Sequence, residues 1–484
     1  MGRNILVFSD GTGQIGGLQP DQRLSNVYKL FRAMRPDPQS PIDPAKQVAF
    51  YDAGLGVGEI REPFFKRVRS FLASALGAGI DENVIDCYEF IIGNYRPGDR
   101  VLLFGFSRGA YTVRAVANVM NLCGVPTKMS DGSPVPQTGE ALRKIASDAV
   151  LYVYNHGAGK KRGDEPYYSQ REEKGRRFRN KYGSAPLKGE NVQGNVQPTF
   201  VGVFDTVAAL DSAVVGRVLL FLIYAIAVAA IVATSMGAAW WLVALLWLAT
   251  GVVGFFYGKL LLSQFKYFSP EGRTLKFKNP GDWWQIWQNG HRAVWNSRHF
   301  DAYLDSDVQH ARHALAIDEH RAKFPRVIWG SSTEAEKTVG RQPTWLKQVW
   351  FAGCHSDIGG SYPEHESRLS DIALDWMVDE VRECVPEVQI NEALLNRWPD
   401  PRGLQHDQTY MPGLEWLGIK WKRKIRAVPD GGDLHPSVIT RLQAEAAPIE
   451  GMMVPYRPPQ LIGHVKVRQI PGFAEAASEQ EAKA

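Results

Sequence analysis

Short apolar runs alternate with segments of helical spacing along the first half of the chain. Buried strands are indicated, by length and by β-branched and aromatic content, at residues 4–8, 47–51, 101–104 and 198–204. Between them, residues 25–34 and 83–95 carry apolar side chains three and four positions apart, as one face of a helix does. This alternation is typical of a parallel sheet, whose ligands bind beyond the carboxyl ends of the strands. The pattern predicts an α/β fold with helices on both faces of the sheet.

The run at 100–122, RVLLFGFSRGAYTVRAVANVMNL, is the most informative stretch. Its apolar strand passes into a GxSxG sequence centred on Ser107, and an Ala/Val-rich helix follows at once and ends near Gly124. Strand, GxSxG and helix in this order indicate a nucleophile elbow, in which glycines permit the sharp turn that lifts the serine above the sheet. We interpret Ser107 as a nucleophile. The alternative is an ordinary turn with Ser107 as a helix N-cap.

Two later strand ends supply candidates for the acid and the base. The strand PTFVGVF at 198–204 ends on Asp205, where the acid is expected in the chain order Ser, Asp, His. The strand LKQVWFA at 346–352, which we expect to be the last of the core, leads to His355 in a glycine-flanked loop. A histidine there can take the serine proton while the carboxylate fixes its tautomer. Asp357 competes for the acid role, although we expect it to cap the following helix or to shape the loop. The simpler alternatives are a strand-end Asp that caps a turn and a loop histidine without a catalytic task.

The loop after the first strand, Ser9-Asp10-Gly11-Thr12-Gly13, can point backbone N–H groups outward. In α/β-hydrolases such a loop supplies one oxyanion-hole donor, and the residue after the nucleophile supplies the other. Gly11, Thr12 and Arg108 are therefore candidate oxyanion-hole residues, with Asp10 as a further site candidate or a turn cap. A phosphatase motif DxDGT is excluded because Phe8 stands where the nucleophilic Asp would be.

A second informative stretch lies at 218–258, where 41 consecutive residues carry no charge. One membrane-spanning helix needs roughly 20 apolar residues, so this run predicts two, with a turn near 235–237. Its ends, Arg217 and Lys259, are both basic, which favours a hairpin that enters from the cytoplasm and returns there. The alternatives are a buried helical hairpin and an amphipathic lid over the active site, but soluble helices rarely stay uncharged on all faces for so long.

The remaining segments give weaker signals. Residues 281–303 mix four tryptophans with Arg and His, which suits either a membrane-surface helix or a packed helix. Residues 160–188 are charged and suggest a surface excursion. Residues 307–324 suggest a helix with His310, His313 and His320 on its face, for which we prefer a structural role over metal binding. After a helix at 371–384, we expect irregular chain with a basic stretch at 420–426.

Composition excludes several classes of protein. The chain has 484 residues and a net charge of +5 with both signs interspersed, so nucleic-acid binding is not indicated. No secretory signal is visible at the start of the sequence. Neither a zinc site nor a disulfide framework is indicated, because no CxxC spacing occurs among Cys87, Cys123, Cys354 and Cys384. We expect no metal and no cofactor.

Four motifs together carry a family resemblance. FSDGTG at 8–13, GFSRGA at 105–110, VFDTV at 203–207 and CHSDIGGSY at 354–362 resemble uncharacterised α/β-hydrolase domains that include phospholipase effectors of type VI secretion. The resemblance runs from the first strand to about Glu383, and HPSV at 435–438 is also similar. It implies a Ser-Asp-His esterase that acts on phospholipid through Ser107, Asp205 and His355, with a membrane-associating insertion.

The expected organisation is a hydrolase core in two parts, 1–212 and 263–472, a transmembrane hairpin at 213–262 between them, and a disordered tail at 473–484. The expected function is that of a membrane-associated serine hydrolase, a phospholipase or lipid esterase. The alternative is a membrane-tethered binding or adaptor protein on an inactive hydrolase scaffold. We expect the inner membrane of a bacterium, with the catalytic domain in the cytoplasm. Secretion as an effector fits less well, because a secreted toxin must stay soluble in transit.

Overall fold

The computed structural model describes most of the chain, and everything below concerns the described residues. These are 2–11, 14, 16, 23–38, 40–54, 78–161, 163–207, 212–272, 279–294, 303–322, 324, 327–330, 340–409 and 420–473. The predicted oxyanion residue Thr12 and the predicted disordered tail, except for Phe473, lie outside them.

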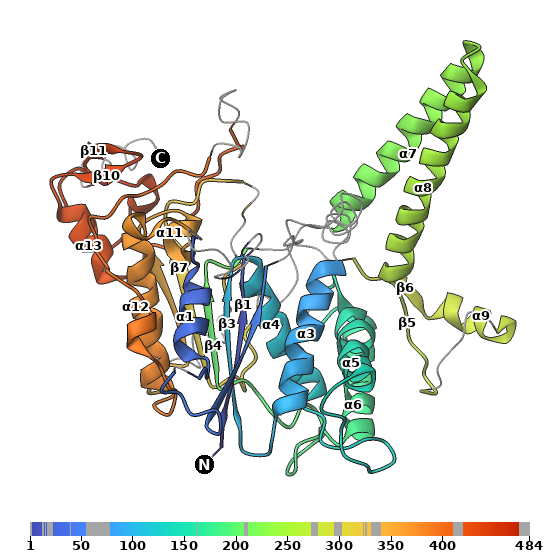
Figure 1. Cartoon of the computed structure of the whole chain (residues 1–484), viewed down its shortest axis with the longest axis horizontal. Coiled ribbons are helices and arrows are strands. Elements are labelled where there is room, and N and C mark those ends of the chain that lie inside the picture. Colours follow the sequence, from blue (N-terminus) through green and yellow to red (C-terminus); the bar gives the residue numbers. More distant parts are fainter. Residues whose placement is uncertain are drawn as a thin grey trace.

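A seven-stranded sheet in the order β2-β1-β3-β4-β7-β8-β9 forms the centre of the molecule, and every neighbouring pair in it is parallel (Figure 1). Two further sheets, β5-β6 and β10-β11, have two antiparallel strands each. The strands are β1 Asn4–Ser9, β2 Gln47–Asp52, β3 Arg100–Phe106, β4 Phe200–Phe204, β5 Phe265–Tyr267, β6 Gly290–Arg292, β7 His310–Ala316, β8 Leu346–Phe351, β9 Asp433–Leu434, β10 Ala447–Ile449 and β11 Met452–Val454.

Helices cover both faces of this sheet, so the predicted α/β class is confirmed. Helices α1 and α12 pack on one face of the sheet. Helices α3 and α4 pack on the other face, with α5 and α6 outside them. The α-helices are α1 Asn26–Met34, α3 Ala78–Asn94, α4 Arg108–Cys123, α5 Glu140–Ser147, α6 Tyr167–Tyr182, α7 Ser212–Ser235, α8 Trp240–Gln264, α9 Pro280–Gln288, α11 His355–Gly359, α12 Arg368–Cys384 and α13 Pro436–Gln443. Short helical turns lie at Asp148–Val153, Tyr154–Gly157, Glu364–Glu366, Glu392–Leu394 and Pro459–Leu461.

Strand alternation divides the core into two clusters. In β1, Ile5 and Val7 face α3 and α4, whereas Leu6 and Phe8 face α1 and α12. All four side chains are fully buried. Burial of one such side chain stabilises the fold by about 1.5–3 kcal/mol, so the central strands fix the sheet and thereby the positions of the residues that follow their carboxyl ends.

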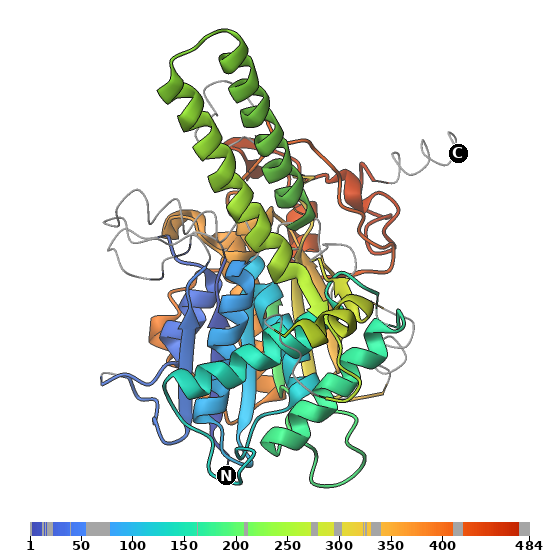
Figure 2. The ribbon, with the colours of Figure 1, turned by 90° about the vertical axis from the view of Figure 1, so that its right-hand side faces the viewer.

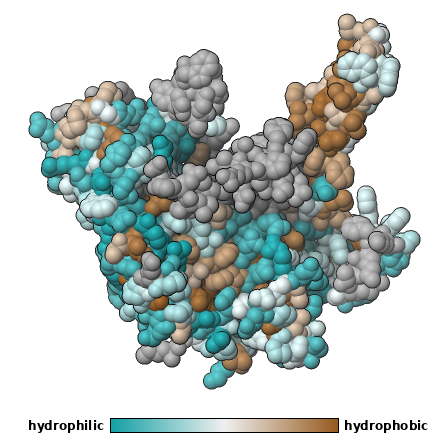
Figure 3. Space-filling view, viewed as in Figure 1, coloured by the Kyte–Doolittle hydropathy of each residue, from teal (hydrophilic) through white to brown (hydrophobic). Residues whose placement is uncertain are grey.

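The uncharged stretch forms a helical hairpin, α7 and α8, which turns at 236–239 with Gly237 at φ 68°. The hairpin projects away from the domain, and its surface is apolar on the side seen in Figure 3 (Figures 1, 2 and 3). The helical segments Val215–Ser235 and Trp240–Gln264 are long and apolar enough to cross a membrane. Of an apolar stretch of 18 residues in each helix, 11% in the first and 0% in the second is buried. The buried-hairpin alternative is therefore wrong.

Several sequence expectations are also wrong in detail. Residues 310–316 form strand β7 rather than a helix, so His310 and His313 do not share a helix face. The segment expected to be a surface excursion contains α6, whose Lys174 and Arg179 are buried. Strand β8 is not the last of the sheet, because β9 pairs with it.

Candidate active site

The nucleophile candidate lies in a strained turn between β3 and α4. Ser107 has φ 58° and ψ −120°, a conformation that L-residues rarely adopt. Both neighbouring glycines are required by close approach: a Cβ on Gly105 would meet the backbone of Ala110, and one on Gly109 would meet the carbonyl oxygen of Ser9. The Ser107 side chain makes no capping hydrogen bond to α4. Ser107 is therefore not a side-chain N-cap, and its backbone has the sharp strand-to-helix turn that a nucleophile elbow requires.

Asp205 and His355 meet although 150 residues separate them in sequence. Asp205 follows β4, and His355 begins α11 just beyond β8. His355 Nδ1 lies 2.6 Å from Asp205 Oδ2, and the two residues are 4% and 0% exposed. This contact orients the other ring nitrogen, Nε2, away from the carboxylate.

The Asp205 carboxylate has further donors. Arg426 donates to it with both terminal nitrogens, at 2.6 and 3.1 Å, and the Ala316 N–H donates at 3.1 Å. Burial alone would raise the pKa of Asp205, but the Arg426 guanidinium and the contact with His355 outweigh burial and hold it well below its usual range. Asp205 is therefore ionised at neutral pH, as the partner of an imidazole base must be.

Aromatic packing brings the serine turn and the histidine together. The Phe106 ring, in the residue before Ser107, lies 4.7 Å from the His355 ring, and the Phe324 ring lies 5.4 Å from it. Among the described residues, the Ser107 hydroxyl makes no hydrogen bond to His355; unliganded sites often have such bonds long. Ser107, Asp205 and His355, which we call the candidate catalytic edge, all follow carboxyl ends of strands in the one parallel sheet.

Asp357, the rival acid, faces a different histidine. Its Oδ2 accepts from the Cys354 N–H at 3.0 Å, in the first turn of α11, and its Oδ1 lies 2.8 Å from His406 Nδ1. The other nitrogen of His406 lies 3.3 Å from Glu366. In this structure Asp357 caps α11 and forms no hydrogen bond with His355.

The loop after β1 abuts the serine turn, since a Cβ on Gly11 would lie 3.3 Å from the Ser107 Cβ. The Gly11 N–H, however, donates to Asp10 Oδ1 at 2.7 Å, so it is not free to receive an oxyanion in this arrangement. Asp10 Oδ2 also accepts from the Ser25 and Tyr51 hydroxyls. Burial raises the pKa of Asp10 to about 6. Of the oxyanion candidates that the structure describes, the Arg108 N–H in the first turn of α4 remains, where helix N–H groups lack intrahelical partners.

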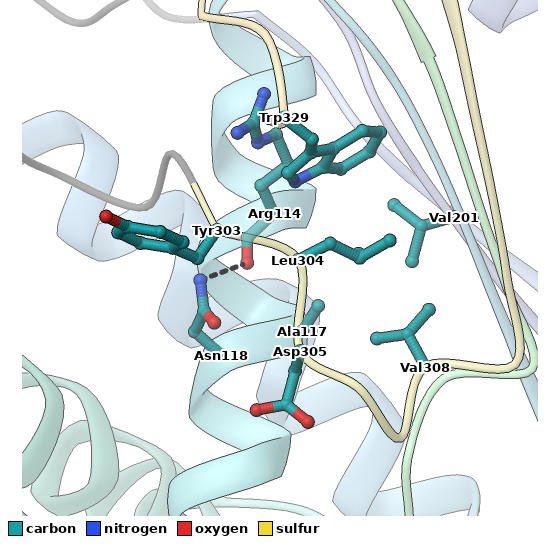
Figure 4. Close-up of a pocket in the computed structure, with 9 residues that line it drawn as sticks. All are labelled: Arg114, Ala117, Asn118, Val201, Tyr303, Leu304, Asp305, Val308 and Trp329. Carbon is teal, nitrogen blue, oxygen red and sulfur yellow. Dashed lines mark hydrogen bonds between the residues drawn. The ribbon is translucent and has the colours of Figure 1, made fainter. Parts of the chain in front are cut away.

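Two residues of this region were not anticipated in their role. His313, in β7, accepts the Thr206 N–H on Nε2 at 3.2 Å and so fixes the backbone next to Asp205. Its ring lies 5.6 Å from Trp329, over which Arg114 stacks at 4.3 Å (Figure 4). Reading 310–316 as a strand would have placed His313 near the end of β4. No local sequence signal points to Arg426.

No group of three His, Cys, Asp or Glu side chains that could hold a metal occurs within the ranges described above. The candidate catalytic edge consists of side chains that can perform acyl transfer without one.

Comparison with known proteins identifies a family, a relative and a similar solved structure. An uncharacterized protein of Saccharomyces cerevisiae is 29% identical over 134 residues, which are 26% of this chain and 18% of the yeast protein. The crystal structure of an uncharacterized protein from Pseudomonas aeruginosa matches with a TM-score of 0.33 and 15% identity, over 82% of this chain and 47% of that one. The chain thus spans less than half the length of either. Residues 3–232 and 277–380, most of the chain, match the catalytic domain of Tle1-like phospholipase effectors of the type VI secretion system, and the chain belongs to this phospholipase family.

Proposed function

We propose that this lipase-type hydrolase is a serine esterase anchored in a membrane, with Ser107 as nucleophile, His355 as general base and Asp205 as the acid that orients it. The observation that supports this most is the buried His355–Asp205 pair beside the strained serine turn. Packed protein at the end of a sheet rarely holds an ionised acid, an imidazole and a serine elbow together without a catalytic use.

In the proposed reaction, Ser107 Oγ attacks the ester carbonyl carbon while His355 Nε2 accepts its proton. The negative charge that develops on the carbonyl oxygen is stabilised by the N–H groups at the start of α4, with Arg108 first among them. The C–O bond then breaks, and His355 gives its proton to the leaving alcohol. Water then attacks the acyl carbon while His355 takes its proton. The bond between the acyl group and Ser107 Oγ breaks, the carboxylic acid leaves, and His355 returns the proton to Ser107 Oγ.

The hairpin supports a lipid substrate. It starts at the carboxyl edge of the sheet, because α7 begins shortly after β4, and Figure 1 shows it on the same side as α11. A helix of 21 residues is roughly 32 Å long at 1.5 Å per residue, enough for the hydrocarbon core. With the hairpin inserted, the candidate catalytic edge faces the lipid surface.

Helix α9 strengthens this orientation. It precedes β6, which pairs with β5 at the base of α8. Trp283, Trp284 and Trp287 are exposed on it, whereas Ile286 is buried. Exposed tryptophans beside the end of an apolar hairpin suit the interface between water and acyl chains. Of the two alternatives for this segment, we therefore favour the membrane-surface helix.

The location follows from the basic ends of the hairpin. Arg217 and Lys259 flank the uncharged stretch, and such residues favour the cytoplasmic side. We propose an inner-membrane enzyme with its catalytic domain in the cytoplasm. The name of the family suggests secretion as an effector, and that route would require the hairpin to be shielded in transit.

Labelling with a fluorophosphonate probe tests the mechanism. We expect the full chain to be labelled and Ser107→Ala not to be. Ser437→Ala is a matched control, since Ser437 is as buried as Ser107, at 9% against 8%, but lies in α13. Absence of Ser107-dependent labelling in folded protein would favour a binding or adaptor protein on a hydrolase scaffold.

A further inference from the structure

Arg426 is the donor to the candidate acid that comes from farthest along the chain. Its two terminal nitrogens bond the two carboxylate oxygens of Asp205, in the parallel arrangement that guanidinium and carboxylate prefer. The same nitrogens reach the carbonyl oxygens of Ala316 and Phe324 at 3.3 and 3.2 Å. Arg426 is 7% exposed, so water screens this pair little.

The segment 420–428, which contains Arg426, forms backbone hydrogen bonds with the loop that follows β7. The Lys424 N–H donates to the His320 carbonyl, and the Ala322 N–H donates to the Lys422 carbonyl, at 2.7 and 2.8 Å. This segment lies beyond residue 380, where the match to the family ends. It contains the basic stretch at 420–426, for which the sequence pattern indicates no function.

We propose that Arg426 is a positioning residue of the active site, which holds the Asp205 carboxylate so that its Oδ2 faces the His355 ring. The inference rests on the proposed function, since it acts through Asp205. It also means that the C-terminal region completes the catalytic centre.

The conformation of Asp205 explains why its carboxylate needs to be held by Arg426. Asp205 has φ 35°, a strained value for a residue other than glycine. Its carboxylate accepts one hydrogen bond from His355, one from Ala316 and two from Arg426, which fills its lone pairs. Without the guanidinium, the buried carboxylate would be free to rotate or to bind a proton, and either change would leave His355 without a fixed tautomer.

The first test compares Arg426→Met with Arg426→Lys in the full chain, on a soluble short-chain ester. We expect Arg426→Met to lower kcat by ~10²-fold, because a small displacement of a catalytic group has this cost, with KM little changed. Lys restores the charge but not the two parallel bonds, so it should recover part of the loss. In Arg426→Met, burial favours the protonated acid, so the acidic limb of the kcat/KM profile should move to higher pH.

Arg423→Met is a matched control, because Arg423 lies in the same segment and contacts His320 rather than Asp205. It should leave kcat and the pH profile unchanged. Near-ultraviolet circular dichroism of each variant checks that the domain is folded.

A double-mutant cycle separates positioning from general stability. In an Asp205→Asn background, Arg426→Met should have little further effect on kcat, since the two residues act as a unit. Costs that multiply, or an unchanged kcat and pH profile in Arg426→Met alone, would overturn the role of Arg426. If Asp205→Asn itself leaves turnover unchanged, the proposed triad fails instead, so the two failures are distinguishable.

Discussion

The candidate catalytic edge and the α7–α8 hairpin lie on the same side of the molecule (Figure 1), but the side chains of the first are buried and those of the second are exposed. At the edge, Asp205 is fully buried and meets four hydrogen-bond donors from three parts of the chain. On the hairpin, Phe221 and Leu248 are 70% and 65% exposed, and uncharged residues cover every side.

This difference shows that the two regions are stabilised by different means. The polar groups of the edge are satisfied inside the domain, so the domain can hold them in place by itself. The apolar side chains of the hairpin find no such cover in the described chain, and exposed apolar area of this size costs free energy in water. An apolar medium outside the protein would remove this cost, and the membrane anchor proposed above would provide one.

The largest expected effects are at the edge. His355→Ala should abolish turnover of a soluble ester, and Asp205→Asn should lower kcat by ~10⁴-fold with the fold intact, because the imidazole loses its fixed tautomer. Asp357→Asn serves as the comparison, because Asp357 bonds His406 and the cap of α11 instead. A greater loss of kcat in Asp357→Asn than in Asp205→Asn would show that the acid is assigned to the wrong residue.

Deletion of residues 218–258 should separate the two regions. The shortened protein should be soluble, should still react with the fluorophosphonate at Ser107 and should hydrolyse a soluble ester at the normal rate. Its activity on phospholipid vesicles should fall by at least ~10²-fold, since anchoring raises the effective concentration of substrate.

Carbonate washing of membranes completes this test. The intact protein should stay in the pellet, because the uncharged stretch at 218–258 favours insertion. Extraction by salt alone would identify the hairpin as a surface-docked lid, and the membrane anchor would have to be abandoned although the hydrolase assignment could stand.

The sequence predicted those elements whose signals are local. The strand before Ser107, the glycines around it and the uncharged hairpin each depend on neighbouring residues, and the strand ends placed Asp205 and His355 at one edge. Strand β7 was missed because it is buried on both faces, so HARHALA shows no alternation, and its histidines mimic helical spacing.

Sequence patterns do not predict polar contacts between side chains that are far apart in the chain. Arg426 lies 221 residues from Asp205, and nothing in its own segment marks it as buried. The charges of α6 indicate a surface segment, but Lys174 is buried because its ammonium group donates hydrogen bonds to the backbone carbonyls of Tyr152 and Tyr267. A charged residue in sequence is thus no guide to exposure when distant backbone can satisfy it.

The tryptophans of α9 allow a smaller test of the boundary between the two regions. Replacement of Trp283, Trp284 and Trp287 by Ala should lower activity on vesicles by about tenfold, equivalent to about 1.4 kcal/mol of binding. Activity on a soluble ester should not change. Trp398→Ala is the control, because Trp398 is also exposed, at 54%, but follows α12, which packs on the face of the sheet opposite α3 and α4. Equal losses on both substrates would place α9 in the catalytic domain's packing rather than at the lipid surface.

The smallest expected effect is on stability, and it belongs to the domain alone. Burial raises the pKa of Asp52 to about 7 from an ordinary value of 3.8, with Ser9 and Asn83 donating to its carboxylate. At Asp52 the folded state therefore binds more protons than the unfolded state between about pH 4 and pH 7, so the contribution of this carboxyl to the free energy of unfolding falls as pH rises through that window and is level above it. One proton gives a slope of at most about 1.4 kcal/mol per pH unit.

Asp52→Asn should remove this contribution from the slope measured by urea unfolding at a series of pH values, whereas Asp433→Asn, at a side chain 72% exposed, should leave the slope unchanged. The hairpin provides a second control, because residues 218–258 contain no Asp, Glu, His, Lys or Arg. Removing them should leave the slope as it is. A slope that changes on deletion would mean that the hairpin alters the burial of acids in the domain, and the two regions would then not be independent.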